Sequence, residues 1–238
     1  MGKIWTVCSG SGGVGKTTVA LSIAVGAAKE GKKTILLDAC GTSRSCDLIL
    51  GLESVFTLDL KDVLRDQIRM ESALYPVPQY ANLSVVCASL CDQVSVSELS
   101  RMILALHSLC DILVVDMPTG QCTLGRGVMQ GGDEVLFVTR PDNASIRATE
   151  SLILHAADDK ANKSLVINRI SQDRIKRKTQ FAQSTVENLL DMTALSCIPE
   201  DSSIPECENG GRPAIECNGP AWTKLSHLCK SFSTARNP

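Results

Sequence analysis

The sequence predicts an α/β fold in which a doubly wound, mostly parallel sheet of about seven or eight strands carries helices on both faces. Short apolar runs alternate with helical stretches along all 238 residues. Several runs, such as residues 112–115, are apolar throughout, which is typical of strands buried on both faces. A glycine-rich loop joins the first run to the first helical stretch. Together these observations favour repeated strand–helix–strand units.

Seven runs have the length and composition of strands, at residues 3–8, 34–37, 83–88, 111–115, 134–139, 164–167 and 194–198. Five stretches have helical character, at residues 17–30, 95–108, 144–157, 176–190 and 220–232. Gly31 suits the position that follows the first helix. Ser95 and Glu98 have the spacing of a capping box at the start of the second helix. Because no linker or repeat interrupts the pattern, we expect residues 1–238 to form a single domain.

The composition argues against several classes of protein. Lys and Arg number 24 and Asp and Glu number 26, so the net charge of −2 provides no global field for nucleic acid or anionic lipid. Aromatic residues make up only 3% of the chain, too few for platforms that stack single-stranded nucleic acid. No apolar window is long enough to predict a membrane span, and the first residues do not resemble a signal peptide, so we expect a cytoplasmic protein.

The 11 cysteines are an odd number and include no C-x-x-C pair. Because the chain shows no export signal, we interpret them as small buried hydrophobic residues in a reducing compartment. A disulfide scaffold is not expected at this chain length.

The strongest motif is the glycine-rich loop at residues 10–17, which matches the phosphate-binding pattern G-x-x-x-x-G-K-[ST]. Glycines allow successive backbone N–H groups to converge on phosphate oxygens, and the next helix directs its positive end toward the same anion. Lys16 would neutralise the β and γ phosphates, and the Thr17 hydroxyl would bind Mg²⁺. A chance glycine-rich turn is the alternative, and the strand–loop–helix setting disfavours it.

The loop resembles the deviant Walker A motif of the MinD/ParA family of P-loop ATPases, and within that family it is most similar to the MinD branch. Further segments resemble family motifs in the same order, namely residues 36–38, 44–53, 114–120, 138–142, 166–169, 198–201 and 211–213. The resemblance therefore covers nearly the whole chain, and it implies a P-loop NTPase fold that binds ATP or ADP with Mg²⁺.

The resemblance also implies which residues form the site. Phosphate contacts are expected from the loop residues Ser11, Gly12, Gly13, Val14, Gly15, Lys16, Thr17 and Thr18. Adenine and ribose contacts are expected from Asn168, Arg169, Pro199, Glu200 and Asp201. Metal contacts are expected from Thr17, Asp38 and Asp116.

The residues themselves leave alternatives open for three of these assignments. Asp116 ends an apolar strand beside the loop, where a carboxylate can reach Mg²⁺, and its other interpretation is a solvated strand end. Asp38 also follows an apolar run, and it could instead cap a helix or turn. The Asn168 amide offers a donor and an acceptor that suit adenine, although a turn-forming role is the competing interpretation.

Two positions depart from the family pattern. Ser11 stands where the family has a lysine that reaches the partner's nucleotide across an ATP-bound dimer, and Cys40 replaces the second aspartate of the D-x-D switch. The expected catalytic set is therefore Lys16, Asp38 and Cys40. Groups supplied across a dimer are worth about 10³–10⁵ in rate in related reactions, and a neutral thiol is a poor acceptor for water.

The departures predict slow ATP hydrolysis and a weak nucleotide-dependent homodimer. Another basic group, such as Arg44 or Lys3, could replace the missing charge. For Cys40 the two interpretations are a neutral filler thiol and a redox-sensitive thiol beside the phosphates.

The final helical stretch places Ala221, Leu225, Leu228, Cys229 and Phe232 at helical spacing. We expect this narrow stripe to pack in the core, and a membrane anchor is the alternative. Direct membrane contact is therefore doubtful, and any peripheral association would go through a partner. The basic run at residues 174–178 is interpreted as a solvated face rather than a DNA-binding surface.

Three functions compete. The first is an ATP-dependent positioning protein that acts on a cell division site or another cargo through an unidentified protein partner. The second is an adaptor of the same fold that binds nucleotide but has lost most hydrolysis. The third is an iron-cluster carrier, which needs paired cysteines. Cys207 and Cys217 are too far apart in sequence to form the expected pair, so we disfavour the third function.

Overall fold

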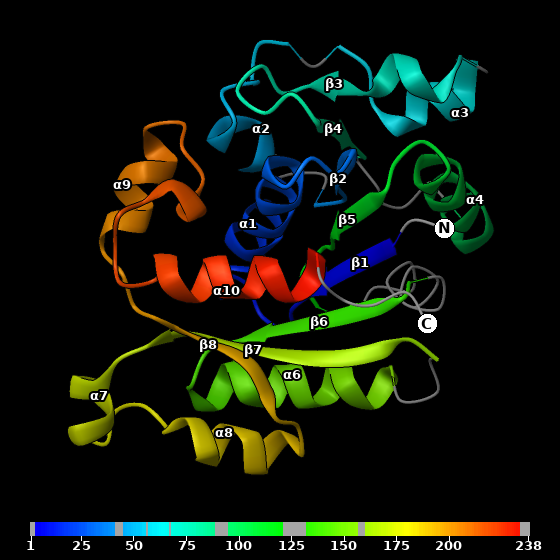
Figure 1. Cartoon of the computed structure of the whole chain (residues 1–238). Coiled ribbons are helices and arrows are strands. Elements are labelled where there is room, and N and C mark those ends of the chain that lie inside the picture. The colour runs from blue at the N-terminus through cyan, green and yellow to red at the C-terminus, as the bar shows by residue number, and fades with distance from the viewer. Residues whose placement is uncertain are drawn as a thin grey trace.

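The computed structural model describes residues 3–40, 45–55, 57–66, 68–88, 95–120, 132–156 and 160–233. Within them lies an eight-stranded sheet of order β3-β4-β2-β5-β1-β6-β7-β8 (Figure 1). Neighbouring strands are parallel except β3 and β4, which are antiparallel. The strands are β1 (Lys3–Cys8), β2 (Thr34–Asp38), β3 (Tyr75–Pro76), β4 (Leu83–Cys87), β5 (Ile112–Asp116), β6 (Glu134–Thr139), β7 (Asn162–Ile170) and β8 (Ala194–Pro199). The predicted fold class is confirmed, and only the short edge strand β3 was not predicted.

The longer helices also agree with the prediction to within about two residues, as is usual for helix ends. They are α1 (Lys16–Lys29), α4 (Val96–His107), α6 (Asn143–His155) and α10 (Trp222–Ser233). Ser95 forms the expected capping box with Glu98 at the start of α4. The short elements α2 (Ser45–Ile49), α3 (Leu60–Asp66), α9 (Ser203–Asn209), η1 (Met70–Ala73) and η2 (Ala214–Glu216) were not predicted.

The helix predicted over residues 176–190 is wrong. The structure has two helices there, α7 (Gln172–Lys176) and α8 (Gln183–Leu190). Between them Lys178 has a left-handed backbone with φ of 57°, which an α-helix does not tolerate. Residues 176–179 are exposed, so no buried face holds this segment in a continuous helix. In the second half of the predicted helix, the helical part is α8, which buries Val186 and Leu190.

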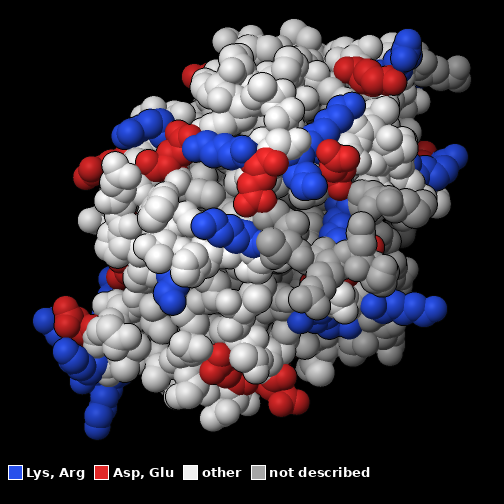
Figure 2. Space-filling view, viewed as in Figure 1, with Lys and Arg blue, Asp and Glu red and all other residues white. Residues whose placement is uncertain are grey.

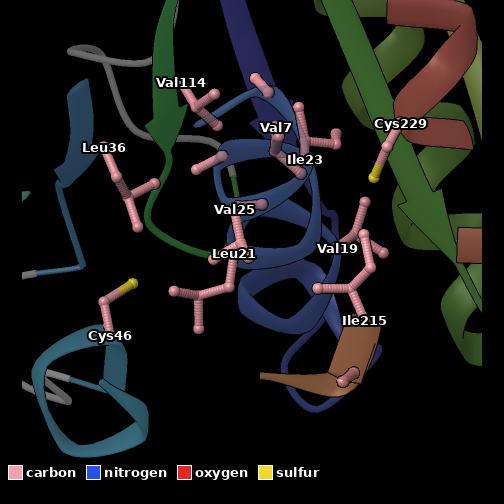
Figure 3. Close-up of a cluster of buried hydrophobic side chains, with 14 of the residues drawn as sticks. Val7, Val19, Leu21, Ile23, Val25, Leu36, Cys46, Val114, Ile215 and Cys229 are labelled. Carbon is pink, nitrogen blue, oxygen red and sulfur yellow. The ribbon is translucent and has the colours of Figure 1, made fainter. Parts of the chain in front are cut away.

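Helices cover both faces of the sheet, and each face has its own core (Figure 1). Trp5 and Val7 of β1 pack with α1 and α10, whereas Ile4 and Cys8 belong to the core formed with α4, α6 and α8. This alternation is the expected consequence of side chains that point to opposite faces of a strand. Figure 3 shows the first core, with side chains from α1, β1, β5 and the C-terminal segments pointing toward one another.

The C-terminal helix α10 packs against α1 rather than presenting an apolar stripe to solvent. Leu225 is fully buried and Leu228 nearly so, and the Cys229 thiol donates to the Ser22 carbonyl at 3.1 Å. A Cβ on Gly26 would lie 2.7 Å from the Cβ of Cys229, so glycine permits this close approach. The predicted core-packing role is confirmed for Ala221, Leu225, Leu228 and Cys229, while the side chain of Phe232 lies outside the described part of the structure. Among the described helices, none is long and apolar enough to cross a membrane.

The cysteine prediction needs one correction. Cys207 of α9 and Cys217 after η2 form a disulfide, because the turn between them brings their Cα atoms to 6.2 Å, within the usual range for a bridge. Cys8, Cys46, Cys87 and Cys229 are buried thiols, as expected, while Cys40, Cys110 and Cys197 are half-buried. Cys91 and Cys122 lie outside the described residues.

Candidate functional site

The candidate site lies where the carboxyl ends of β2, β5 and β1 meet. These three strands are neighbours in the sheet, and the register pairs Asp38 with Asp116 and Asp116 with Val7. The glycine-rich loop follows β1 directly and leads into α1. Parallel strands therefore bring the loop and the two predicted aspartates to one edge, the usual place for a ligand in an open α/β sheet.

The loop adopts a conformation that requires glycine. Gly13 and Gly15 have φ of 70° and 91°, in the left-handed region that glycine enters without a steric penalty. A Cβ on Gly15 would collide with the side chain of Asn168, and one on Gly10 would collide with the backbone of Ala148 in α6. Because α1 begins at Lys16, the free N–H groups of its first turn lie at the end of the loop, which suits an anion.

Lys16 forms a buried ion pair with Asp116. Its ammonium is 2.6 Å from Asp116 Oδ1 and donates to Cys40 Sγ at 3.0 Å, while Thr17 Oγ1 donates to Asp116 Oδ2 at 2.7 Å. Lys16 is 6% exposed and Asp116 is fully buried. Burial opposes the charged form of Lys16, but the attraction of Asp116 and Cys40 outweighs it, so the pKa of Lys16 is raised. The ammonium is therefore positive at neutral pH and is held beside Asp116 at the end of the loop; its contact with phosphate stays a prediction.

Asp38 is held by the backbone that follows it. Its two carboxylate oxygens accept hydrogen bonds from the N–H groups of Cys40 at 2.9 Å and Cys46 at 3.4 Å. Burial and repulsion from Asp116 raise its pKa. The carboxylate therefore orders the local backbone, in line with the turn-capping interpretation. It also lies beside Asp116 in the sheet register, and its contact with Mg²⁺ stays a prediction.

Cys40 lies between Lys16 and the end of β5. Its thiol donates to the Met117 carbonyl at 3.2 Å and lies 3.7 Å from Asp116 Oδ2. Burial, followed by the charge of Asp116, raises the pKa of Cys40 to about 12 even though Lys16 opposes the shift. The thiol is therefore neutral at physiological pH, which favours the interpretation as a neutral side chain over a reactive thiolate.

The residues present fit a divalent cation. The Thr17 hydroxyl and the carboxylates of Asp38 and Asp116 are hard oxygen donors of the kind that Mg²⁺ prefers. One ligand atom from each of Asp38, Cys40 and Asp116 lies within 4.8 Å of the other two. The predicted metal residues are thus brought together, and Cys40 joins them.

Asn168 connects β7 to the phosphate loop. Its Nδ2 donates to the Val14 carbonyl at 2.8 Å, and its Oδ1 accepts from the Arg169 N–H at 2.9 Å. Arg169 follows with φ of 57° and an exposed side chain. The structure thus brings Asn168 against the loop, where its amide bonds to the protein itself. The predicted contact with adenine stays a prediction.

The segment after β8 is held by its own contacts. Asp201 accepts from Ser203 N at 3.0 Å, from Ser203 Oγ at 2.6 Å and from Ala221 N at 2.9 Å, so it joins the starts of α9 and α10. Glu200 pairs with Arg174 at 3.2 Å. The nearest contact from this region to the loop is one that the sequence did not predict, in which Thr18 Oγ1 donates to Glu208 Oε1 at 2.8 Å.

Neither of the two basic residues considered as a replacement for the missing family lysine is seen beside the loop. Ser11 Oγ lies 3.3 Å from Ser145 Oγ within the same chain. Lys3 begins β1, about 17 Å along the strand from Cys8 and at the opposite edge of the sheet from the loop, so it is not a substitute. Arg44, the other candidate, lies outside the described residues.

Comparisons with known proteins agree with this geometry. A family model described as "ParA: NUBPL iron-transfer P-loop NTPase" matches residues 1–232. The septum site-determining protein MinD of Synechocystis sp. is 29% identical over 219 residues, which covers 90% of this chain and 82% of that protein.

Two solved structures share the fold. A chain of the MinC:MinD cell division protein complex of Aquifex aeolicus superposes with a TM-score of 0.89 at 28% identity, covering 99% of this chain and 97% of that chain. MinD of Pyrococcus horikoshii, solved with Mg-ADP, superposes with a TM-score of 0.85 at 24% identity, covering 98% and 96%. The chain therefore belongs to the ParA/MinD family of P-loop NTPases.

Proposed function

We propose that this chain binds ATP and ADP together with Mg²⁺ and acts as a MinD-like ATPase in spatial positioning, such as selection of the cell division site. The observation that carries the proposal is the phosphate loop itself, in which Lys16 and Thr17 converge on Asp116. Family membership and the names of the relatives support the ligand and the process.

Residues Ser11–Thr18 would surround the phosphates with backbone N–H groups. Thr17, Asp38 and Asp116 would hold Mg²⁺, which when bound supplies positive charge that offsets the phosphate oxygens. Asn168, Arg169 and the segment 199–201 would border the adenine and ribose. Because Asp201 and Glu200 have protein partners, we assign this segment's contacts to its backbone and to Pro199.

Lys16 has to exchange one partner for another when nucleotide binds. In the structure its ammonium is neutralised by Asp116, and with nucleotide bound it would turn to the β and γ phosphates. The ion pair protects a buried charge until then. The exchange also frees Asp116 and the Thr17 hydroxyl to bind the cation, so phosphate and metal binding are expected to be coupled.

Hydrolysis is expected to be slow. In this family's pattern the position of Cys40 carries an aspartate that orients the attacking water. A neutral thiol is a poor acceptor for a proton of that water. Ser11 has no charge and bonds to Ser145 of its own chain, so it cannot stabilise phosphate charge in a second subunit. We therefore infer a weak nucleotide-dependent homodimer.

A second candidate is an adaptor that binds nucleotide and a protein partner without turnover. The raised pKa of Cys40 favours it, since that group would not act as a base near neutral pH. The Aquifex relative is solved in a complex with MinC, which supports a protein partner for either candidate. We do not propose iron transfer, because the sequence has no C-x-x-C pair to hold a cluster.

The test combines phosphate release with light scattering in ATP and in ADP. The wild type is expected to bind both nucleotides, to release phosphate slowly and to remain largely monomeric. The variants Ser11→Lys and Cys40→Asp, alone and together, restore the family residues. A gain in turnover and dimerisation by the double variant supports the first candidate, whereas nucleotide binding without any gain favours the adaptor. Fast turnover by the wild type would contradict the assigned effects of Ser11 and Cys40.

A further inference from the structure

We propose that Asp38, Cys40 and Asp116 form a binding site for a thiophilic divalent cation, such as Zn²⁺ or Cd²⁺, in the nucleotide-free protein. One ligand atom from each of the three residues lies within 4.8 Å of the others. The site needs no nucleotide, so it stands apart from the ATPase proposal.

One pair of the proposed ligands already has nearly the separation found in a tetrahedral metal site. Zinc bonds of about 2.3 Å to sulfur and about 2.0 Å to oxygen place two such ligands about 3.5 Å apart. Cys40 Sγ lies 3.7 Å from Asp116 Oδ2, so this pair needs almost no movement. A second thiol, Cys46 Sγ, lies 3.8 Å from the same oxygen.

The third ligand is already oriented. Asp38 accepts the N–H groups of Cys40 and Cys46, and outer hydrogen bonds of this kind fix ligand carboxylates in metal sites. Three protein ligands leave a fourth position for water or a phosphate oxygen, which is the usual arrangement of zinc sites that bind exchangeable ligands. Cys40 is half-buried whereas Cys46 is buried, so a cation reaches the cluster from the Cys40 side.

The cluster already attracts a positive charge. The Lys16 ammonium lies 2.6 Å from Asp116 Oδ1 and 3.0 Å from Cys40 Sγ, so two of the three proposed ligands contact a cation in the structure. Lys16 therefore competes with the metal, and its removal is expected to tighten metal binding.

Sulfur determines which cation the site prefers. A site made of oxygen alone suits Mg²⁺, whereas a thiolate selects softer ions such as Zn²⁺ and Cd²⁺. The Cys40 thiol loses its proton to solvent as the metal–sulfur bond forms, so binding releases one proton per ion and tightens as the pH rises.

The experiment titrates Cd²⁺ into the nucleotide-free full chain and follows the ultraviolet charge-transfer absorbance of Cd²⁺–thiolate bonds. The wild type is expected to gain this absorbance at one ion per chain, Zn²⁺ is expected to displace Cd²⁺, and millimolar Mg²⁺ is not. Cys40→Ser is expected to lose the absorbance and at least about tenfold in affinity. The matched control Cys110→Ser, which alters a half-buried thiol outside the cluster, is expected to behave as the wild type.

Two further variants complete the test. Lys16→Met is expected to bind Cd²⁺ at least about tenfold more tightly, because it removes the competing charge. Cys40→Asp is expected to bind the cation, as measured by calorimetry, but to lack the thiolate absorbance. Thermal melting is used to check that each variant is folded. Equal absorbance and affinity in the wild type and Cys40→Ser would overturn the proposal. A failure of ADP to bind would leave this result unchanged and would count only against the ATPase proposal.

Discussion

Substitution of Asp116 by alanine tests how the ligand-free protein holds its phosphate-loop lysine. Lys16 is 6% exposed, and within the described part of the chain its one carboxylate partner is Asp116, at 2.6 Å. Removal of one member of such a buried pair costs about 3–5 kcal/mol, and the loss of the Thr17 hydrogen bond adds about 1 kcal/mol. The unfolding entropy of a chain of 238 residues is about 0.5 kcal/mol/K. The melting temperature of Asp116→Ala is therefore expected to fall by about 8–12 °C.

Urea denaturation and differential scanning calorimetry without nucleotide measure this effect. The control is Glu71→Gln, which breaks an exposed ion pair with Arg69 at 3.2 Å and is expected to cost less than about 1 kcal/mol. The double variant Lys16→Met with Asp116→Ala removes both charges and is expected to recover part of the loss. A melting temperature within about 2 °C of the wild type for Asp116→Ala would refute this account of the pair.

Three further substitutions test other parts of the molecule. Gly15→Ala introduces a Cβ that meets Asn168 at a φ of 91°, so ADP affinity measured by calorimetry is expected to fall at least about tenfold; an unchanged affinity would contradict the loop geometry. Asp142→Ala removes the N-cap of α6 and is expected to cost about 1 kcal/mol at neutral pH. Burial alone would raise the pKa of Asp142, but hydrogen bonds from Ser145 and Arg140 lower it. Its contribution is therefore present above about pH 4 and is lost as the pH falls through the lowered pKa, which urea titrations at several pH values check. Leu225→Ala, in the fully buried stripe of α10, is expected to cost about 2–5 kcal/mol in urea without changing co-sedimentation with anionic vesicles; a change in co-sedimentation would favour the anchor.

The strands and the long helices were predictable because their signals are local. A run such as residues 112–115 is apolar on both faces and is buried on both, so composition alone identifies it. Ser95 and Glu98 formed the capping box that their spacing indicated. The prediction of one helix over residues 176–190 was wrong because a run of charged residues carries no information about where a helix ends. The left-handed backbone of Lys178 belongs to the exposed turn around it.

The basic run at residues 174–178 was interpreted as a solvated face, and its basic side chains are exposed. Figure 2 shows Lys and Arg side chains gathered over α7, with acidic groups nearby and both signs interspersed on the rest of this face. Arg174 of this run pairs with Glu200 at 3.2 Å. On the visible face, blue and red side chains are thus mixed rather than gathered into one extended basic surface (Figure 2).

The site was predictable in its residue types but not in its contacts. The motifs placed Lys16, Asp38 and Asp116 together, because all three follow strands that end at one edge. The bond between Thr18 and Glu208 joins residues 190 positions apart, and that between Asn168 and Val14 spans 154. No local pattern encodes such pairs, since they depend on how α9 and β7 pack against the loop. The disulfide of Cys207 and Cys217 joins residues only 10 positions apart; it was missed because the cysteines were interpreted as thiols in a reducing compartment.

Calorimetric titration of the full chain with ADP and with ATP, each in excess Mg²⁺, tests most directly whether the loop binds nucleotide. The predicted result is one nucleotide per chain, with binding lost in Lys16→Met and weakened when Mg²⁺ is removed. Titrations that show no heat of binding at millimolar nucleotide, or equal binding by the wild type and Lys16→Met, would contradict the assignment of the loop as a nucleotide site.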